Sequence, residues 1–453
     1  MRPDAELDIA VIGGGISGIT TAILLQITGH STALYTTIQP CFEPGAGRPE
    51  EFATLHAAAS VIPHSVASPK LSHWTGISQH FFRALSLPGS CGVRRQLHYE
   101  ISEDPNEAAP GYAGSVENFA WLTADELNQP WVPKRSAARG TYGWKFDAFF
   151  CEAPEYLRFL YAFYARIGGR LRQPPAVDGL APYLALGHDI FVNCTGFGAY
   201  GLLESATRDP RCTDNPMLPD FEPLIDPFPP KLIRGHYLRM DIKEILTGHR
   251  GQFLSYSYKP TTDIYRTATG LAADVYCYQR SDAWILGGSR QVGSIDDHGN
   301  WFGEQTVGGE REFARRNAPP LAVPAPIFEL NADILLRLSN GRVDLERLRR
   351  NDPGIVSPGI GYRFVRASES DNVRVSCSRV QFGGDRKYIL HNYGHGGSGY
   401  TLSWGCAFDI LQMLGRITEV PPQLAGHSKF AIGDTAIRGL LGNVIARLLS
   451  HGA

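Results

Sequence analysis

Glycines near the N-terminus have the spacing of a ligand-binding loop. Gly13, Gly15 and Gly18 follow a short apolar run and open a helical pattern. In such an arrangement the glycines allow a tight turn, close approach of the backbone to a pyrophosphate, and close packing of helix on strand. The N–H groups and the positive dipole end of the helix would then face the phosphates. The sequence therefore predicts a dinucleotide-binding loop.

The second strand of this unit departs from the usual dinucleotide pattern. Thr36 and Thr37 stand where an acidic residue commonly binds the adenosine ribose. A hydroxyl can still bond to ribose, although less strongly than a carboxylate. No arginine stands at this place, so a ligand with a 2′-phosphate is not favoured.

A second glycine cluster lies near the C-terminus. Four glycines between residues 394 and 399 separate an apolar run at 388–390 from a helical pattern at 401–414. A loop of this kind lets backbone approach a flat ligand, and the N–H groups at the start of the helix can stabilise negative charge on its edge. The spacing therefore indicates a second loop that can approach a flat ligand.

Periodicity predicts the elements that would position these loops. The expected strands are residues 8–12, 31–35 and 388–390, and the expected helices are residues 16–28, 154–167 and 401–414. A further amphipathic helix is expected at residues 433–449, with Asp434 as its N-cap. We expect this last helix to pack on its own domain in preference to forming a homodimer contact.

The composition argues against several classes of protein. With 453 residues, the chain is long enough for one large or two interleaved domains. A net charge of −2 gives no reason to expect nucleic acid or a membrane surface as a partner. Eight cysteines without a CxxC pair indicate reduced thiols and no metal site. The apolar run at residues 9–27 is cut by four glycines, so neither a signal peptide nor a membrane span is expected. We expect a cytoplasmic protein.

The C-terminal glycine loop carries a family resemblance. Residues 388–407, YILHNYGHGGSGYTLSWGCA, closely resemble the C-terminal signature of the D-amino acid oxidase family. Residues 141–144 (TYGW), 190–196 (IFVNCTG) and the pair Arg234-Gly235 resemble further segments of that family, in the same order. The resemblance implies non-covalent FAD as the cofactor, a small amino acid or amine as the substrate, and dioxygen as the electron acceptor.

The same resemblance indicates which residues meet the substrate. Residues 361–366, GYRFVR, resemble the family's GFRPVR, whose first arginine clamps the substrate carboxylate, and this maps onto Arg363. A guanidinium suits that task because it forms two parallel charge-assisted hydrogen bonds. Tyr276 aligns with the tyrosine that helps to hold the carboxylate, and Tyr278 is the reserve candidate. Gly397 is expected at the reacting centre as well.

One expected tyrosine is missing. The family's second active-site tyrosine would fall at Ala272. We therefore expect a wider pocket that favours a large side chain, with its roof rebuilt by the inserted loop at residues 256–265. His391 and His395 are expected to shape the flavin loop by hydrogen bonds and not to transfer protons.

The residues expected to bind the cofactor come from both glycine loops and from the strand ends near them. They are Gly13, Gly15, Ile16, Ser17, Gly18, Thr36, Thr37, Ala57, Ala58, Thr195, Gly196, Gly396, Gly397, Ser398, Gly399, Tyr400 and Thr401.

The expected fold is α/β, with a Rossmann-type FAD-binding domain interleaved with an α+β substrate domain that contains a large, mostly antiparallel sheet. The FAD domain is expected at residues 1–62, 147–200 and 360–453, and the substrate domain at 63–146 and 201–359. Stretches rich in proline, glycine and charge at residues 201–233, 243–275 and 297–350 are expected to form loops around the substrate entrance.

The expected activity is removal of hydride from the α carbon of a D-amino acid, which yields a keto acid, ammonia and hydrogen peroxide. Three alternatives remain open at this point. They are a tailoring oxidase of a bulky amino acid or cyclic amine, an oxidase of glycine or sarcosine, and a flavin-binding protein without turnover.

Overall fold

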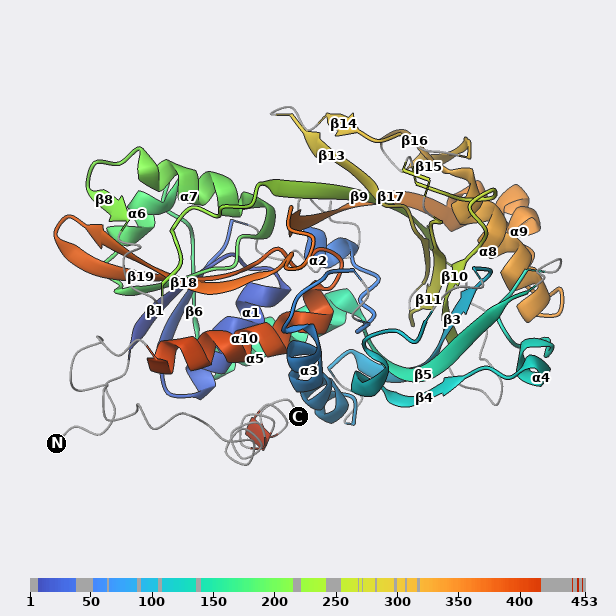
Figure 1. The fold of residues 1–453 in the computed structure, drawn as a ribbon, viewed down its shortest axis with the longest axis horizontal. Helices are drawn as coiled ribbons and strands as arrows, with labels where there is room; N and C mark the ends of the chain where they lie inside the picture. Colours follow the sequence, from blue (N-terminus) through green and yellow to red (C-terminus); the bar gives the residue numbers. More distant parts are fainter. Residues whose placement is uncertain are drawn as a thin grey trace.

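A computed structural model shows two sheets, one toward each end of the long axis of the molecule (Figure 1). The described residues are 7–37, 52–62, 65–87, 91–104, 108–135, 140–214, 221–241, 254–267, 269–270, 272–281, 283–296, 300–305, 308–315, 318–416 and the single positions 442, 446, 447 and 450.

The first sheet contains the two predicted strand–loop–helix units. Its seven strands run in the order β6-β2-β1-β7-β19-β18-β8, and the pairs from β6 to β19 are parallel. The strands are β1 (Asp8–Ile12), β2 (Ser31–Tyr35), β6 (Arg170–Arg172), β7 (Ile190–Asn193), β8 (Cys212–Asp214), β18 (Arg374–Phe382) and β19 (Asp385–Tyr393). The expected strands at 8–12 and 31–35 have the predicted bounds.

Helices cover both faces of this sheet. On one face lie α1 (Ile16–Ile27), α5 (Ala153–Arg166) and α10 (Gly399–Arg416), and on the other α6 (Leu180–Leu184) and α7 (Ala199–Thr207) (Figure 1). Helix α1 is apolar all round because it packs between the sheet and α10. Its approach depends on Gly18, where a Cβ would overlap the carbonyl of Gly13. Helix α3 (Leu71–Leu85) packs against α10, and the short α2 (Ala53–His56) lies near the join of the two sheets.

The second sheet runs in the order β14-β13-β9-β12-β11-β10-β3-β5-β4, with β17 paired to β9. Its pairs are antiparallel, apart from the parallel pair of β10 and β3. The strands are β3 (Val93–Ser102), β4 (Glu117–Trp121), β5 (Tyr142–Cys151), β9 (Pro230–Met240), β10 (Leu254–Lys259), β11 (Val275–Gln279), β12 (Trp284–Gly287), β13 (Gln291–Ile295), β14 (Trp301–Gly303) and β17 (Val356–Arg366).

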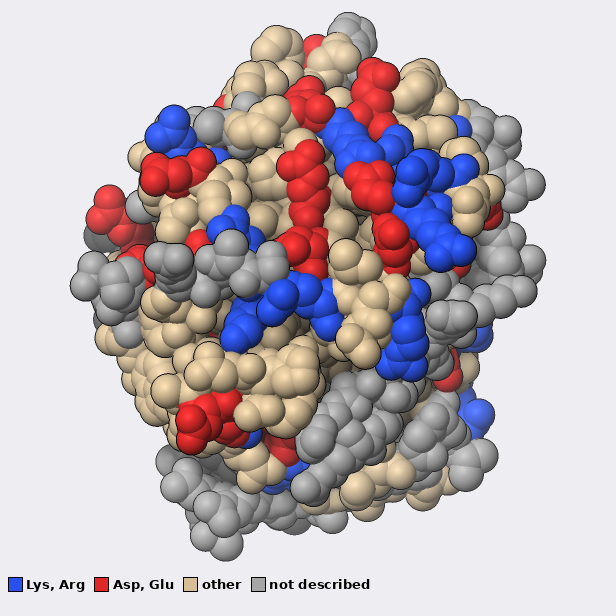
Figure 2. All heavy atoms as spheres, turned by 90° about the vertical axis from the view of Figure 1, so that its right-hand side faces the viewer, with Lys and Arg blue, Asp and Glu red and all other residues tan. Residues whose placement is uncertain are grey.

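Two helices and a hairpin cover the outer side of the second sheet. They are α8 (Ala325–Leu338), α9 (Leu345–Asn351) and the pair β15 (Glu310–Arg315) and β16 (Ala318–Pro324), while α4 (Ala124–Leu127) lies beside β4. Figure 2 shows basic and acidic side chains interspersed over this end of the molecule. Arg311 and Glu346, for example, pair at 2.7 Å.

The structure corrects the expectation that two long insertions are loops. Residues 243–275 contribute β10, and residues 297–350 contribute β14, β15, β16, α8 and most of α9. Their charged and proline-rich composition hid the buried residues by which β10, β15, β16, α8 and α9 pack into the second core. Trp301 of β14 packs against the core of the first sheet instead. Strands β5 and β17 also run across the expected domain boundaries at 147 and 360, and β8 joins the first sheet.

The predicted C-terminal helix at 433–449 lies almost wholly outside the described residues. Of the few described positions there, Arg447 donates a hydrogen bond from Nη1 to the carbonyl of Ile27 at 2.8 Å. Within the described parts of the chain, no helix is both long and apolar enough to cross a membrane.

Candidate active site

A long cavity begins at the N-terminal glycine loop. This part has a volume of about 420 Å³ and is lined by the loop at 13–17, the end of β2 with Thr36 and Thr37, the turn at 195–198, and residues 394–396 and 399. The carboxyl ends of β1, β2 and β7 meet here, as expected for a nucleotide site in a parallel sheet. We call it the dinucleotide cavity.

A second cavity of about 140 Å³ continues from the first. Both are lined by Ile16, Ala53, Thr54, Tyr362, Gly396 and Gly399. The far part of the second cavity is enclosed by β9, β11, β12 and β17 of the second sheet, and its near part by Ala57, Ala58 and Tyr400. We call it the substrate cavity. The two together form one continuous site that links both glycine loops to the second sheet.

The residues present fit an extended cofactor such as FAD. A Cβ at Gly13 would overlap the carbonyl of Cys194, so only glycine allows this turn to lie against β7. His395 lines the cavity, and its buried Nε2 has no hydrogen-bond partner among the described residues. A polar ligand atom in the cavity would supply that partner.

The histidines of the C-terminal loop are neutral hydrogen-bonding groups, as expected. Burial lowers the pKa of His395 to about 4, and its Nδ1 lies 3.3 Å from Ser17 Oγ. Burial and two nearby arginines lower the pKa of His391 well below its ordinary value, and its Nε2 lies 2.9 Å from Ser378 Oγ.

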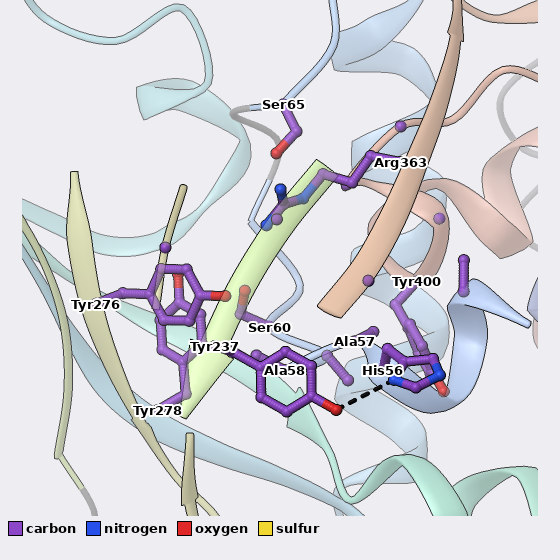
Figure 3. A pocket seen from close by; sticks show the side chains of 18 of the residues that line it. His56, Ala57, Ala58, Ser60, Ser65, Tyr237, Tyr276, Tyr278, Arg363 and Tyr400 are labelled. Carbon is purple, nitrogen blue, oxygen red and sulfur yellow. Dashed lines mark hydrogen bonds between the residues drawn. The ribbon is translucent and has the colours of Figure 1, made fainter. Parts of the chain in front are cut away.

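Arg363 and Tyr276 meet in the substrate cavity, and glycines make the room for them. A Cβ at Gly235 on β9 would overlap the guanidinium of Arg363, and one at Gly287 on β12 would overlap the ring of Tyr276. Both side chains therefore lie flat across a neighbouring strand. Their polar ends point into the same space (Figure 3), and the charge of Arg363 favours the ionised form of the Tyr276 hydroxyl and so opposes the rise of its pKa.

The guanidinium of Arg363 is held in place by residues that the sequence analysis missed. Its Nη1 donates to the carbonyl of Ser289 at 3.0 Å. The Oγ of Ser289 accepts from the backbone N–H of His236 at 2.8 Å and lies 2.8 Å from its Nδ1. Burial first, and then the charges of Arg234 and Arg363, lower the pKa of His236 to about 3. This neutral histidine therefore adds no positive charge behind the clamp.

Tyr276 stays protonated in this site. Burial raises its pKa above the ordinary value of 10, although Arg363 opposes the shift. Its hydroxyl is thus a donor for a substrate oxygen. Its ring stacks on that of Tyr278, with centroids 4.5 Å apart and planes 12° apart. The reserve candidate therefore lines the same cavity and supports Tyr276 from behind.

The C-terminal glycine loop is hydrogen-bonded to β17, the strand that carries Arg363. The N–H of Gly396 donates to the carbonyl of Phe364 at 2.8 Å. Gly397 lines the substrate cavity, where a Cβ would overlap the hydroxyl of Ser65. The absence of a side chain at Gly397 therefore leaves room for Ser65 and for the stem of Arg363, whose Cδ would lie 3.3 Å from a Cβ there.

The remaining sequence-predicted residues divide into two groups. The cavities are lined by Gly13, Gly15, Ile16, Ser17, Thr36, Thr37, Ala57, Ala58, Thr195, Gly196, Gly396, Gly397, Gly399 and Tyr400. Gly18, Ser398 and Thr401 line neither cavity. Thr401 instead donates to the carbonyl of Ile62 at 3.2 Å, which joins α10 to the segment after α2.

The expected roof over the pocket is not formed by residues 256–265. Tyr256 is buried and donates to Asn331 on α8 at 2.7 Å, away from the cavity. Tyr265 borders a small neighbouring cavity instead. Ala272 itself is not among the residues that line the substrate cavity.

A second arginine also lines the substrate cavity. Arg290 pairs with Asp274 at 3.5 Å. The carboxylate of Asp274 is the main cause of the raised pKa of Arg290, so this pair is charged on both sides and neutral as a whole. Sequence reasoning missed it because neither residue belongs to a recognisable motif.

Comparison with known proteins agrees with this geometry. Residues 8–413 match a family model described as FAD dependent oxidoreductase, DAO. A D-amino-acid oxidase of Rubrobacter xylanophilus is 25% identical over 420 residues, which cover 92% of this chain and 98% of the relative. A D-amino-acid oxidase of Dictyostelium discoideum is 21% identical over 415 residues, which cover 90% and 92%.

A solved structure shares the fold. Glycine oxidase from Geobacillus kaustophilus superposes with a TM-score of 0.54 at 15% identity, over 91% of this chain and 95% of that one. The family match confirms the resemblance drawn from the C-terminal motif, and with it the FAD cofactor. The chain belongs to the DAO family of FAD-dependent oxidoreductases, flavoproteins that act on amino acids or amines.

Proposed function

We propose that the protein oxidises the Cα–N bond of a D-amino acid. The product is an imine that hydrolyses to a keto acid and ammonia, and dioxygen is the final electron acceptor, which gives hydrogen peroxide. The observation that carries this proposal is the meeting of Arg363 and Tyr276 in a cavity continuous with both glycine loops. The names of the two relatives support it.

Each group in the cavity has a task in this reaction. Arg363 binds the substrate carboxylate through parallel charge-assisted hydrogen bonds, and the carbonyl of Ser289 fixes its direction. The hydroxyl of Tyr276 donates a hydrogen bond to the same carboxylate. FAD, when bound, supplies the two-electron acceptor. The rate then depends on orientation, because a neutral amine lets the Cα hydrogen leave as hydride without a side-chain base.

The proposed D configuration rests on the two relatives named D-amino-acid oxidases, and the selection of one enantiomer rests on three fixed directions around Cα. The clamp, the tyrosine and the cofactor face together allow the hydrogen of only one enantiomer to point at the cofactor. An L-substrate would exchange its side chain and amine, and the amine would then lose its polar partners. Leaving such a group unpaired costs about 1–3 kcal/mol or more, enough for strong discrimination.

The test is anaerobic reduction of the bound flavin by pairs of enantiomers. D-amino acids should bleach the flavin faster than their mirror images, and glycine and sarcosine should be slow. Rapid bleaching by an L-enantiomer with none by its D-form would overturn the proposed handedness. If no amino acid or amine bleaches the flavin, the protein is a flavin-binding protein without turnover.

A tailoring oxidase of a bulky amino acid or cyclic amine is the second candidate. The observation in its favour is the set of polar side chains in the substrate cavity beyond the clamp, which includes Tyr237 and the pair Asp274 and Arg290. Reduction by cyclic secondary amines, without reduction by common D-amino acids, would favour this candidate.

A further inference from the structure

Tyr237 is a third polar side chain that lies flat in the substrate cavity. It stands on β9, opposite Gly287 of β12 and Gly359 of β17 in the sheet register. A Cβ at Gly359 would overlap the ring of Tyr237, just as one at Gly287 would overlap the ring of Tyr276. Tyrosine and glycine therefore alternate in one row across β11, β12, β9 and β17, and both tyrosine rings line the cavity. The row is Tyr276, Gly287, Tyr237 and Gly359.

His56 orients the hydroxyl of Tyr237. The Nδ1 of His56 lies 3.1 Å from the Tyr237 hydroxyl, and the ring centroids are 6.2 Å apart (Figure 3). His56 is the last residue of α2 and directly precedes the predicted cofactor contacts Ala57 and Ala58. The pair therefore joins the second sheet to the cofactor side of the cavity. Neither residue belongs to the carboxylate clamp.

The pair has the chemistry of a neutral hydrogen-bonding subsite. A phenol oxygen can take part in three hydrogen bonds, so its contact with His56 is compatible with one to a ligand. When His56 Nδ1 accepts the phenol proton, the phenol oxygen is an acceptor for the ligand; with the other tautomer the phenol is a donor. A carboxamide or hydroxyl can use either arrangement.

The charged side chains of the cavity also favour a neutral substrate group at Tyr237. Arg363 is committed to the substrate carboxylate, and Arg290 is paired with Asp274. These two also lie off the row that carries Tyr276 and Tyr237. The end of the cavity formed by Tyr237 and His56 therefore offers hydrogen bonds, and the row of residues that carries Tyr237 contains no charged side chain.

We propose that Tyr237, oriented by His56, selects the side chain of the substrate and favours one that ends in a neutral hydrogen-bonding group. This inference rests on the proposed function for the carboxylate clamp. A site built to hydrogen-bond a ligand discriminates against an isostere that lacks the polar group, because its own polar groups are then left unpaired.

Binding of unreactive analogues tests the subsite separately from turnover. The probes are 3-carbamoylpropanoate and 4-methylpentanoate, which share the carboxylate and the shape of asparagine and leucine but lack the amine. Their dissociation constants for the FAD-loaded protein would be measured by calorimetry. We expect the affinity ratio of amide to isobutyl analogue to fall about tenfold or more in Tyr237→Phe, and by a smaller factor in His56→Leu.

A matched control separates this effect from a general loss of a tyrosine hydroxyl. Tyr256→Phe removes a buried hydroxyl from the neighbouring β10, bonded to Asn331 and outside both cavities. The ratio should stay at its wild-type value in this variant. A ratio that is also unchanged in Tyr237→Phe overturns the subsite. If His56→Leu fails to bind FAD, Tyr237→Phe alone decides.

Turnover distinguishes failure of the subsite from failure of the proposed function. D-asparagine should reduce the flavin with a higher specificity relative to D-leucine in the wild type than in Tyr237→Phe. If neither substrate reduces the flavin while the analogues show the expected change of ratio, the proposed function fails and the subsite stands. If both are oxidised with equal ratios in the two proteins, only the subsite fails.

Discussion

The guanidinium of Arg363 lies directly over the backbone of Gly235 on the adjacent strand. In the register of β17 and β9, Arg363 is opposite Ile233 and Gly361 is opposite Gly235, so the arginine reaches diagonally across β9. A Cβ at Gly235 would occupy the space of its guanidinium. Gly235 is therefore part of the carboxylate clamp, although it contributes no functional group.

Gly235→Ala should weaken substrate binding while the fold survives. The atoms in the way are the far end of a flexible side chain, so Arg363 can move aside at little cost to stability. Misplacement by about 1 Å can lower kcat/KM by about 100-fold. The measurement is kcat/KM beside the melting temperature, with Gly201→Ala as control, since a Cβ there meets open space. Unchanged kinetics in Gly235→Ala would show that Arg363 is not fixed by this contact.

Arg363→Leu should keep the flavin but lose most activity on carboxylate substrates. Removing one partner of a desolvated charge-assisted pair costs about 2–5 kcal/mol, or tens to thousands of fold in kcat/KM. Arg363→Lys should recover only part of the loss, because an ammonium keeps the charge but not the planar pair of donors. Steady-state kinetics and the flavin spectrum check both variants. Near wild-type kcat/KM in Arg363→Leu would place the clamp elsewhere.

The protein should lose stability as the pH falls from about 6.5 toward 4. The pKa of His395 is about 4 in the folded protein, below the ordinary value of about 6.5. Between these two pH values the unfolded chain binds more protons than the folded protein. The contribution of His395 to the free energy of unfolding is therefore complete above pH 6.5 and is lost as the pH falls toward 4. The difference corresponds to about 3 kcal/mol. Melting temperatures from pH 4 to 7.5 should fall less steeply in His395→Gln; equal slopes would contradict the assignment. His236, whose pKa is also lowered, adds the same pH dependence to the wild type and to the variant, so it does not affect the comparison.

The flavin should be released intact by acid or heat. No cysteine is among the described residues that line the substrate cavity, and Cys406 is buried in α10 outside both cavities. After precipitation, the yellow colour and the FAD should be found in the supernatant. Flavin that remains on the denatured chain would contradict this, and a peptide map would then show whether His56 carries it.

The N-terminal unit could be predicted almost residue by residue. Its strands are short apolar runs, and the helix between them ends at Ile27, two residues before Gly29, which has a positive φ of 98°. Local chemistry determines these bounds. The two histidines of the C-terminal loop were likewise interpreted correctly, because burial and hydrogen bonding are the usual fate of such groups.

The wall of the substrate cavity could not be predicted in the same way. It depends on which residues stand opposite one another on β11, β12, β9 and β17, and that register is set by contacts far apart in the sequence. Glycine within a strand often marks close approach of a side chain. Gly235 and Gly359 stand in β9 and β17, which the sequence analysis did not predict as strands, and sequence alone does not say whose side chain lies over them.

The hydrogen bond from Gly396 to Phe364 has a consequence for how such a protein can change. The clamp and the cofactor loop share one stretch of chain, and this bond closes the stretch back on itself next to Arg363. The hydrogen bond thus fixes the distance between Arg363 and the cofactor loop, and insertions elsewhere in the chain do not change that distance. Tyr237 stands on another strand and takes no part in holding the substrate carboxylate, so its replacement leaves that distance unchanged. A change of substrate choice, natural or engineered, is therefore expected at Tyr237 on β9, while the reacting geometry stays constant.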